Sequence, residues 1–258
     1  MSQSCILFCR CSAGIISDGK LHAIGELVAG TEADVYELHD LCELVIDRKS
    51  FLQEINAKYT AKILIACYPR AVGKMLEQAG VPLSGMQVLN FRELSAENIQ
   101  KKLRDDLSFP EGKPKYQRVK SALEVPAWFP VIDPEKCTLC GQCARFCLFG
   151  VYRFQDKKLE VVNPLNCKNL CPACGRTCPA SAIIFPRLKE NLVLSGAEPG
   201  QLKIDWNISK GESMFSMLQQ RNQNRRSILK SGIVQQAEEE RRKALEQYEK
   251  QNPDPGHL

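Results

Sequence analysis

The sequence predicts an α/β N-terminal domain with a small parallel sheet, then an α+β ferredoxin-like dicluster domain and a helical C-terminal tail. Three observations lead to this prediction. Short apolar segments alternate with helical patterns over residues 1–107. Eight of the thirteen cysteines fall in two tight runs within residues 131–186. From about Ser213 to Gln251 the chain is polar and rich in residues that favour helices.

The N-terminal domain is expected to contain four strands, because four short segments are apolar and bounded by turn or helix signals. These segments are Ser4–Phe8, Ala33–Leu38, Lys62–Ala66 and Gln87–Phe91. Helical patterns lie between and after them, at Leu21–Val28, Asp47–Tyr59, Ala71–Gln78 and Ser95–Leu107. Strands that alternate with helices are typical of a parallel sheet covered by helices.

Residues 108–130 have the composition of a linker, since several prolines and a glycine interrupt a basic stretch. Trp128 and Phe129 at its end are expected to pack against the domain that follows. Residues 187–258 are predicted to form an irregular segment and then the helical tail. Pro253 and Pro255 end that helical pattern.

The two cysteine runs have the spacing that holds two cubane iron–sulfur clusters. The first run reads C-x2-C-x2-C-x3-C from Cys137 to Cys147, and the second reads C-x3-C-x2-C-x3-C from Cys167 to Cys178. In such runs the fourth cysteine of each run binds the cluster of the other run. The expected ligands are therefore Cys137, Cys140, Cys143 and Cys178 for cluster 1, and Cys147, Cys167, Cys171 and Cys174 for cluster 2.

This region resembles bacterial-type dicluster ferredoxins, which implies two four-iron, four-sulfur (4Fe-4S) clusters and one-electron transfer. The sequence departs from that pattern in two places. Leu148 follows the first run where the family has a proline, and the first loop of the second run is one residue longer. Structural zinc is the alternative, but three cysteines at x2 steps in one loop suit a single tetrahedral ion poorly.

Four further cysteines follow predicted strands in the N-terminal domain. Cys9 and Cys11 follow the first strand, Cys42 follows the second, and Cys67 directly follows the third. Ligands bind at the carboxyl ends of the strands of open parallel sheets, so these thiols are candidates for a third 4Fe-4S cluster. Cys5 lies within the first strand and is expected to face the core. The alternatives are a redox-active dithiol or buried cysteines that act as small apolar residues.

The residues Phe8-Cys9-Arg10-Cys11 and Ala66-Cys67-Tyr68-Pro69-Arg70 resemble motifs in the N-terminal domain of heterodisulfide reductase A subunits. This resemblance implies an electron-carrying subunit or adaptor that works with a heterodisulfide-reductase-like or other oxidoreductase complex. No G-x-G-x-x-G sequence follows a predicted strand, so no flavin or nicotinamide is expected in this chain.

The predicted function is an electron-transfer protein that passes single electrons through the clusters to a larger oxidoreductase, rather than a stand-alone enzyme. The alternative is a thiol/disulfide oxidoreductase subunit with its active site at Cys9, Cys11, Cys42 and Cys67. A protein in which the clusters are only structural is the third interpretation. Reversible reduction of the clusters would argue against it.

Composition points to a cytoplasmic protein, because clustered cysteines without a signal-peptide pattern indicate metal or redox chemistry. No apolar run is long enough to insert into a membrane, and the tail lacks the interleaved aromatic and basic residues of nucleic-acid binders. Arg145 and Arg176 are candidates for docking an acidic partner or are solvated. Arg70 is a candidate thiolate neighbour or a surface ion pair, and His39 is expected at the surface or in a helix cap.

Overall fold

The computed structural model describes residues 4–106, 115–198, 239, 242 and 243. A five-stranded sheet organises the N-terminal part, with strand order β4-β3-β1-β2-β5 and every neighbouring pair parallel. Its strands are β1 (Ser4–Cys9), β2 (Asp34–Leu38), β3 (Ala61–Ala66), β4 (Met86–Asn90) and β5 (Tyr116–Val119). The first four coincide with the four predicted strands.

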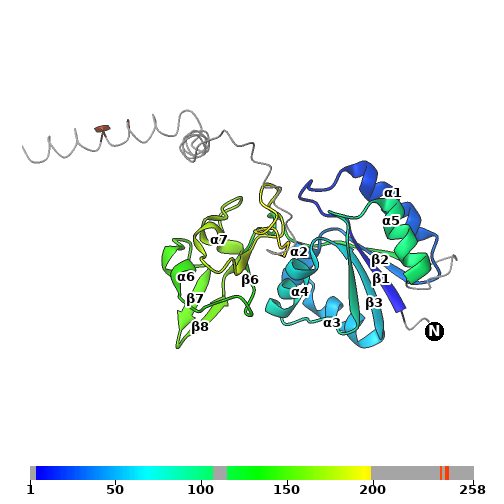
Figure 1. Ribbon diagram of the computed structural model, residues 1–258, viewed down its shortest axis with the longest axis horizontal. Coiled ribbons are helices and arrows are strands. Elements are labelled where there is room, and N and C mark those ends of the chain that lie inside the picture. The colour runs from blue at the N-terminus through cyan, green and yellow to red at the C-terminus, as the bar shows by residue number, and fades with distance from the viewer. Residues whose placement is uncertain (1–3, 107–114, 199–238, 240–241, 244–258) are drawn as a thin grey trace, which may run out of the picture. The chain divides into compact units, whose positions relative to one another are not determined.

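Helices cover both faces of this sheet. Figure 1 shows α1 (Asp18–Ala29) and α5 (Ala96–Lys101) on one face, and α2 (Leu41–Asp47), α3 (Lys49–Lys58) and α4 (Pro69–Gln78) on the other. Helix α5 is capped at its beginning, because the Ser95 hydroxyl accepts a hydrogen bond from the Asn98 amide. A π-helical turn, Lys102–Asp106, continues α5.

Two elements of the N-terminal part were not expected from the sequence. The composition of residues 108–130 predicts a linker, but Tyr116–Val119 forms the edge strand β5 beside β2. The Tyr116 hydroxyl donates a hydrogen bond to the Glu37 carboxylate on β2. The second unexpected element is α2, which begins directly after Asp40 and contains Cys42 in its first turn.

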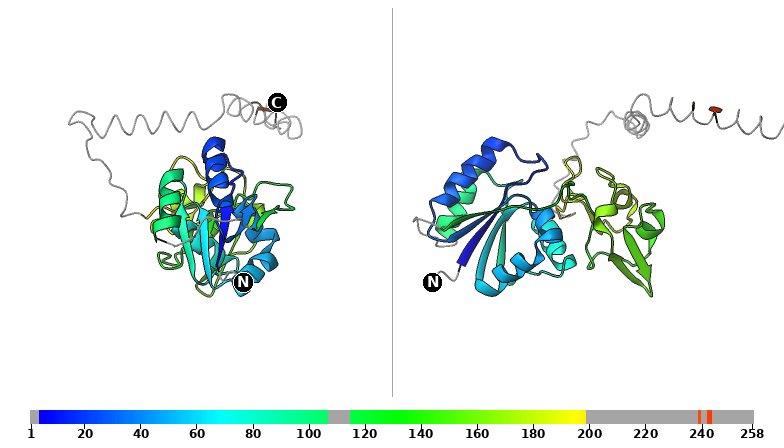
Figure 2. Two further views of the ribbon diagram at one scale, coloured as in Figure 1. Left: turned by 90° about the vertical axis from the view of Figure 1, so that its right-hand side faces the viewer. Right: turned by 180° about the vertical axis from the view of Figure 1, so that it is seen from behind.

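The strand order places a switch point beside β1. The chain passes from β1 to β2 on one side and then returns to β3 on the other side of β1. The connecting helices therefore lie on opposite faces, and the carboxyl ends of β1 and β3 border a crevice. Both views in Figure 2 show these strands running side by side. Cys5 is fully buried within β1, as expected.

The cysteine runs lie in a second domain built from two similar halves. Its elements are β6 (Val131–Ile132), α6 (Gln142–Phe146), β7 (Tyr152–Gln155), β8 (Lys158–Val161), the 3-10 turn Pro164–Asn166, α7 (Ala173–Thr177) and β9 (Ile183–Ile184). β6 pairs with β9 and β7 pairs with β8, both antiparallel. Leu139 and Leu170 occupy the same place in the two loops, and both have positive φ angles. The domain therefore contains an internal repeat that is visible in the backbone.

The sheet domain and the cysteine domain belong to one compact unit and share a polar interface. The Gln78 side chain on α4 donates to the Pro130 carbonyl and accepts from the Ile132 amide. Trp128 stacks on Phe185 with ring centroids 5.3 Å apart, as expected of a residue that packs against the second domain. Arg70 forms a buried ion pair with Asp133, so the predicted surface ion pair is wrong.

The predicted tail lies almost entirely outside the described residues. Within it, the structure describes Glu239, Arg242 and Lys243, which are helical. Glu239 and Lys243 form an ion pair of 3.3 Å at helical i,i+4 spacing. Among the helices of the described residues, none is long and apolar enough to cross a bilayer.

Candidate iron–sulfur sites

The first cysteine run wraps a loop that is fixed by backbone hydrogen bonds. The Cys137 amide donates to the Asp133 carbonyl at 3.0 Å, which anchors the beginning of the loop. Cys143 lies in α6, and Cys147 ends this helix, its amide donating to the Cys143 carbonyl at 3.1 Å. The run therefore directs its last cysteine away from the loop that holds the first three, as the crossed assignment of ligands requires.

The second run repeats this arrangement with one additional residue. The Cys171 amide donates to the Lys168 carbonyl at 3.1 Å, which closes the longer loop into a turn. Cys174 lies in α7, and Cys178 ends that helix. The added residue lies before α7 begins. Cys178 therefore directly follows α7, as Cys147 directly follows α6.

The electrostatic neighbours of Cys143 and Cys167 include the fourth cysteine of the other run. Burial raises the pKa of Cys143 to about 11, and its charged neighbours are Cys174, which belongs to the predicted set of cluster 2, then Cys137 and Cys178. Burial raises the pKa of Cys167 to about 12, and its charged neighbours are Cys174, Cys171 and Cys147. The structure thus brings the fourth cysteine of each run to the other run.

Cys140 differs from the other members of its set because it is exposed. The backbone N–H of Gln142 lowers the pKa of its thiol. All thirteen cysteines are described, and each carries a free thiol. Within residues 4–106, 115–198, 239, 242 and 243, no three His, Cys, Asp or Glu side chains are grouped to hold a single metal ion. A cubane takes four thiolates spread over a larger volume, so the donor chemistry of both sets fits it.

Hydrogen bonds to sulfur distinguish the two halves of the domain. The Tyr152 hydroxyl donates to Cys174 Sγ at 3.1 Å, in the predicted set of cluster 2. In the set of cluster 1, the Ala182 backbone amide donates to Cys178 Sγ at 3.3 Å. Burial and the neighbouring Cys174 thiolate raise the pKa of Tyr152, so its hydroxyl stays a proton donor. The sequence analysis did not identify Tyr152.

The four N-terminal cysteines converge at the switch point of the sheet. Cys9 ends β1, Cys11 follows it, Cys42 lies in α2 and Cys67 follows β3. All four are buried. A hydrogen bond to Cys11 and burial raise the pKa of Cys67, and the nearby Cys9 and Cys42 raise it further. Four thiols from three separate segments are thus close neighbours.

Cys11 differs from the other three thiols of this group because its pKa is lowered. The hydrogen bond that it accepts from Cys67 lowers its pKa, against the effects of burial and of the Asp40 carboxylate. Its backbone lies in the left-handed region with φ 50, which is uncommon for a residue with a side chain. Burial and Asp40 raise the pKa of Cys9 and of Cys42, so these two thiols retain their protons in the iron-free protein.

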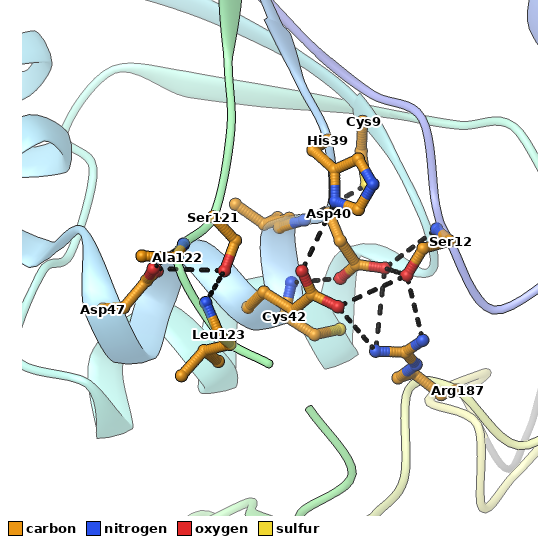
Figure 3. A network of polar contacts seen from close by, with 12 residues as sticks. Cys9, Ser12, His39, Asp40, Cys42, Asp47, Ser121, Ala122, Leu123 and Arg187 are labelled. Atoms are coloured by element: carbon orange, nitrogen blue, oxygen red, sulfur yellow. Dashed lines mark hydrogen bonds and ion pairs between the residues drawn. The ribbon is translucent and has the colours of Figure 1, made fainter. Parts of the chain in front are cut away.

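A buried polar network lies beside these thiols (Figure 3). The Asp40 carboxylate accepts hydrogen bonds from the Cys42 amide at 2.8 Å and from the Ser12 amide and hydroxyl at 2.9 Å each. The Arg187 guanidinium reaches the same network from the cysteine domain. It lies 3.8 Å from Asp40 and 3.6 Å from Glu43, and donates to the Ser12 hydroxyl at 3.0 Å.

Only part of this network had a signal in the sequence. An aspartate two residues before Cys42 is a common helix cap, so Asp40 was identifiable in principle. Arg187 follows the second cysteine run by several residues and belongs to no local pattern, so only the fold reveals it. His39 lies at the surface as expected, with a half-exposed side chain 3.4 Å from Glu43.

Aromatic residues lie between the N-terminal thiols and the second cysteine run. Cys42 lines a small crevice together with Trp128, Phe185 and Arg187. The Trp128 indole N–H donates to the Cys171 carbonyl at 3.4 Å. The N-terminal group is therefore connected to the predicted set of cluster 2 through one buried pair of stacked rings.

Comparison with known proteins identifies the second domain. Residues 129–198 match the 4Fe-4S dicluster domain family. Over 61 residues the chain is 41% identical to an uncharacterized ferredoxin of Methanocaldococcus jannaschii, which covers 23% of this chain and 42% of that ferredoxin. The chain thus spans less than half the length of this curated relative. No solved structure matches the chain.

These similarities support an iron–sulfur domain that transfers electrons. The matched family region begins at residue 129 and excludes the five-stranded sheet. The resemblance of residues 1–107 to heterodisulfide reductase A subunits therefore stays a prediction.

Proposed function

We propose that this protein relays single electrons through two 4Fe-4S clusters to a larger oxidoreductase. Cluster 1 is held by Cys137, Cys140, Cys143 and Cys178, and cluster 2 by Cys147, Cys167, Cys171 and Cys174. The observation that carries the proposal is the crossing of the runs, with Cys178 beside Cys143 and Cys147 beside Cys167. Crossed ligation holds two clusters close together, and each cluster accepts and donates one electron.

The proposal extends to a third 4Fe-4S cluster held by Cys9, Cys11, Cys42 and Cys67. Four thiolates are the ligand number of a cubane, and these four buried thiols are electrostatic neighbours. The Leu41 amide already donates to Cys9 Sγ at 3.4 Å, the type of contact that stabilises a thiolate ligand. Arg187 supplies a positive charge beside a site that would otherwise combine thiolates with two carboxylates.

One observation favours a second candidate, a thiol/disulfide site. Cys11 and Cys67 share a hydrogen bond that lowers the pKa of Cys11 and raises that of Cys67, as in a nucleophilic thiolate with its resolving thiol. Their oxidation to a disulfide would release two electrons and two protons. The two ferredoxin clusters would each accept one of these electrons, so the electron count is balanced.

The partner in this proposal is a heterodisulfide-reductase-like or other oxidoreductase complex in the cytoplasm. Support comes from the pairing of a thiol-rich α/β domain with a dicluster domain in one chain. None of the thirteen cysteines, all of which are described, forms a disulfide, which is also characteristic of a reducing compartment. The chain would act as a subunit or carrier and not as an enzyme by itself.

Iron and acid-labile sulfide in anaerobically purified protein test both parts. About eight of each per chain are expected for two clusters, and about twelve for three. Replacing Cys9 and Cys11 with serine should remove about four irons and leave the dicluster signal in the EPR spectrum. Cys5→Ala is the matched control, because Cys5 is a buried cysteine of the same strand that faces the core.

The outcomes separate the candidates. If the Cys9→Ser/Cys11→Ser variant keeps all its iron but loses a fast-reacting thiol, the third cluster is disproved and the dithiol site is supported. Zinc without iron in the purified wild-type protein would disprove the electron relay. Iron that dithionite cannot reduce would leave the clusters with a structural role only.

A further inference from the structure

Large apolar side chains are exposed around the cysteines of cluster 2. Leu148 is 91% exposed and Leu170 is 73% exposed. Phe146, Phe149 and Leu165 are also exposed. Cys147 lies within this group and Cys167 beside it, and both are partly exposed. We call these five apolar residues the Cys147 patch. A soluble protein that exposes several neighbouring large apolar groups commonly binds a partner there.

Hydrogen bonds and thiol contacts hold the parts of the Cys147 patch together. Phe146, Leu148 and Phe149 lie at the end of α6 and in the loop that follows it. The Asn163 side chain donates to the Gly150 carbonyl at 3.0 Å, which ties this loop to the turn that contains Leu165. Leu170 lies in the loop between Cys167 and Cys171, and Cys147 is an electrostatic neighbour of Cys167.

The internal repeat shows that large exposed apolar residues at the end of the helix and in the loop after it are specific to the first half. Aligning α6 with α7 places Thr177, Pro179 and Ala180 at the positions of Phe146, Leu148 and Phe149. The loop after α7 contacts the sheet domain, because Arg70 donates to the Ser181 carbonyl at 2.8 Å. The half that meets the sheet domain thus has small residues, whereas the equivalent loop of the other half carries large apolar ones.

The charges of the surrounding loops identify the kind of partner. Between Cys137 and Gln155 the charged residues are Arg145 and Arg153, and between Asn163 and Ser181 they are Lys168 and Arg176. Neither segment contains an aspartate or glutamate. Arg153 and Arg176 form ion pairs with Glu160 and Glu190. Arg145 and Lys168 are exposed, and they are the cations that border the Cys147 patch in this proposal. An apolar surface bordered by cations complements an apolar surface bordered by carboxylates, and a second copy of the same face would repel it.

We propose that the Cys147 patch is the docking surface for an acidic electron-transfer protein, which exchanges electrons with cluster 2. This inference rests on the proposed function and adds the surface and the partner's chemistry. The N-terminal thiol group is connected to the cluster 2 set through Trp128, which lines a crevice with Cys42 and donates to the Cys171 carbonyl.

The test compares two carrier proteins of opposite charge, an acidic flavodoxin and a basic cytochrome c, with methyl viologen as a small mediator. Stopped-flow rates are measured for the full-length, iron-loaded protein. The wild-type protein should react with flavodoxin at least tenfold faster than Leu148→Glu or Arg145→Glu. Raising the salt concentration should slow only the wild-type reaction with flavodoxin. Calorimetric affinity for flavodoxin should fall in parallel, a readout that does not depend on electron transfer.

Leu192→Glu is the matched control, since Leu192 is an exposed leucine of the same domain outside the patch. It should behave as the wild type. Methyl viologen that has first been reduced to its radical cation with dithionite should donate one electron to every variant at the same rate, which shows intact clusters. Equal flavodoxin rates for Leu148→Glu and wild type, or faster reaction with cytochrome c, would overturn the docking proposal alone. So would a wild-type dimer that Leu148→Glu dissociates. Absence of iron would instead overturn the proposed function.

Discussion

The Arg70 guanidinium lies 2.7 Å from the Asp133 carboxylate, and both side chains are almost completely buried. Arg70 belongs to α4 of the sheet domain, and Asp133 directly follows β6 of the dicluster domain. The same arginine donates to the carbonyls of Ser181 and Ala197. One side chain thus connects the segment after Cys67 to the segments that begin and end the cysteine runs.

Replacing Arg70 with methionine should lower the free energy of unfolding by about 3–5 kcal/mol, because Asp133 would remain buried without its partner. Denaturant unfolding of the iron-loaded protein measures this change. Arg118→Gln is the control. Arg118 pairs with Glu37 but is largely exposed, so its loss should cost less than about 1 kcal/mol.

The double variant Arg70→Met/Asp133→Leu isolates the pair. It should recover much of the loss, because the unpaired charge is removed. A single variant as stable as the wild type would show that the ion pair does not stabilise the contact between the domains.

The sequence predicted most of what local patterns can encode. Strands β1 to β4 were predicted because each is a short apolar run, and the first three carry or precede the N-terminal thiols. The spacing also predicts both crossed ligand sets, which stay a prediction. Strand β5 was missed because Tyr116–Val119 is a polar edge strand in a proline-rich stretch. Contacts over long sequence separations, such as those of Arg187 with Asp40, depend on the assembled domains and have no local pattern.

Tyr152→Phe should lower the reduction potential of cluster 2. A hydrogen bond to a ligand sulfur stabilises the more negative, reduced state, and this variant removes the one donated to Cys174. A net hydrogen bond of about 1 kcal/mol corresponds to tens of millivolts, since about 1.4 kcal/mol is about 59 mV for one electron. EPR-monitored redox titration measures the shift.

Tyr116→Phe is the control for that titration, because its hydroxyl contacts Glu37 in the sheet domain. It should leave both potentials unchanged. Equal potentials in Tyr152→Phe and the wild type would mean that this hydroxyl does not tune the cluster.

Arg187→Gln should reduce iron binding at the N-terminal thiol group and leave the dicluster domain loaded. The variant removes the positive charge beside the buried carboxylates of Asp40 and Glu43. Assembly of a negatively charged centre next to two carboxylates then becomes less favourable. A loss of up to about four irons per chain is expected. Arg176→Gln should retain all iron, since its ion pair with Glu190 is exposed. Full iron in Arg187→Gln would contradict the stabilising role of Arg187.

Gly196→Ala should destabilise the contact between the turn that ends the dicluster domain and α4. A Cβ atom at Gly196 would lie 2.4 Å from the Ala71 Cβ, and the backbone φ of +112 is strained for any side chain. A loss of about 1–3 kcal/mol is expected in denaturant unfolding. Gly73→Ala in α4 should instead stabilise by about 0.5–1 kcal/mol, because no atom lies within 4 Å of the added group. If Gly196→Ala raised the free energy of unfolding as Gly73→Ala does, the contact between this turn and α4 would not contribute to stability.

The buried thiol of Cys5 should make the free energy of unfolding fall with rising pH, beginning at the pH where an ordinary thiol ionises. Burial raises the pKa of Cys5 to about 12, so the folded state keeps the proton that the unfolded chain releases above about pH 9. The stability advantage is complete below that pH. It then falls by about 1.4 kcal/mol for each pH unit until about pH 12. Denaturant unfolding of wild type and Cys5→Ala at pH 7 and pH 10 measures this difference. The stability of the wild type relative to Cys5→Ala should fall by roughly 1.4 kcal/mol between these two pH values, whereas an unchanged difference would mean that Cys5 ionises normally in the folded protein.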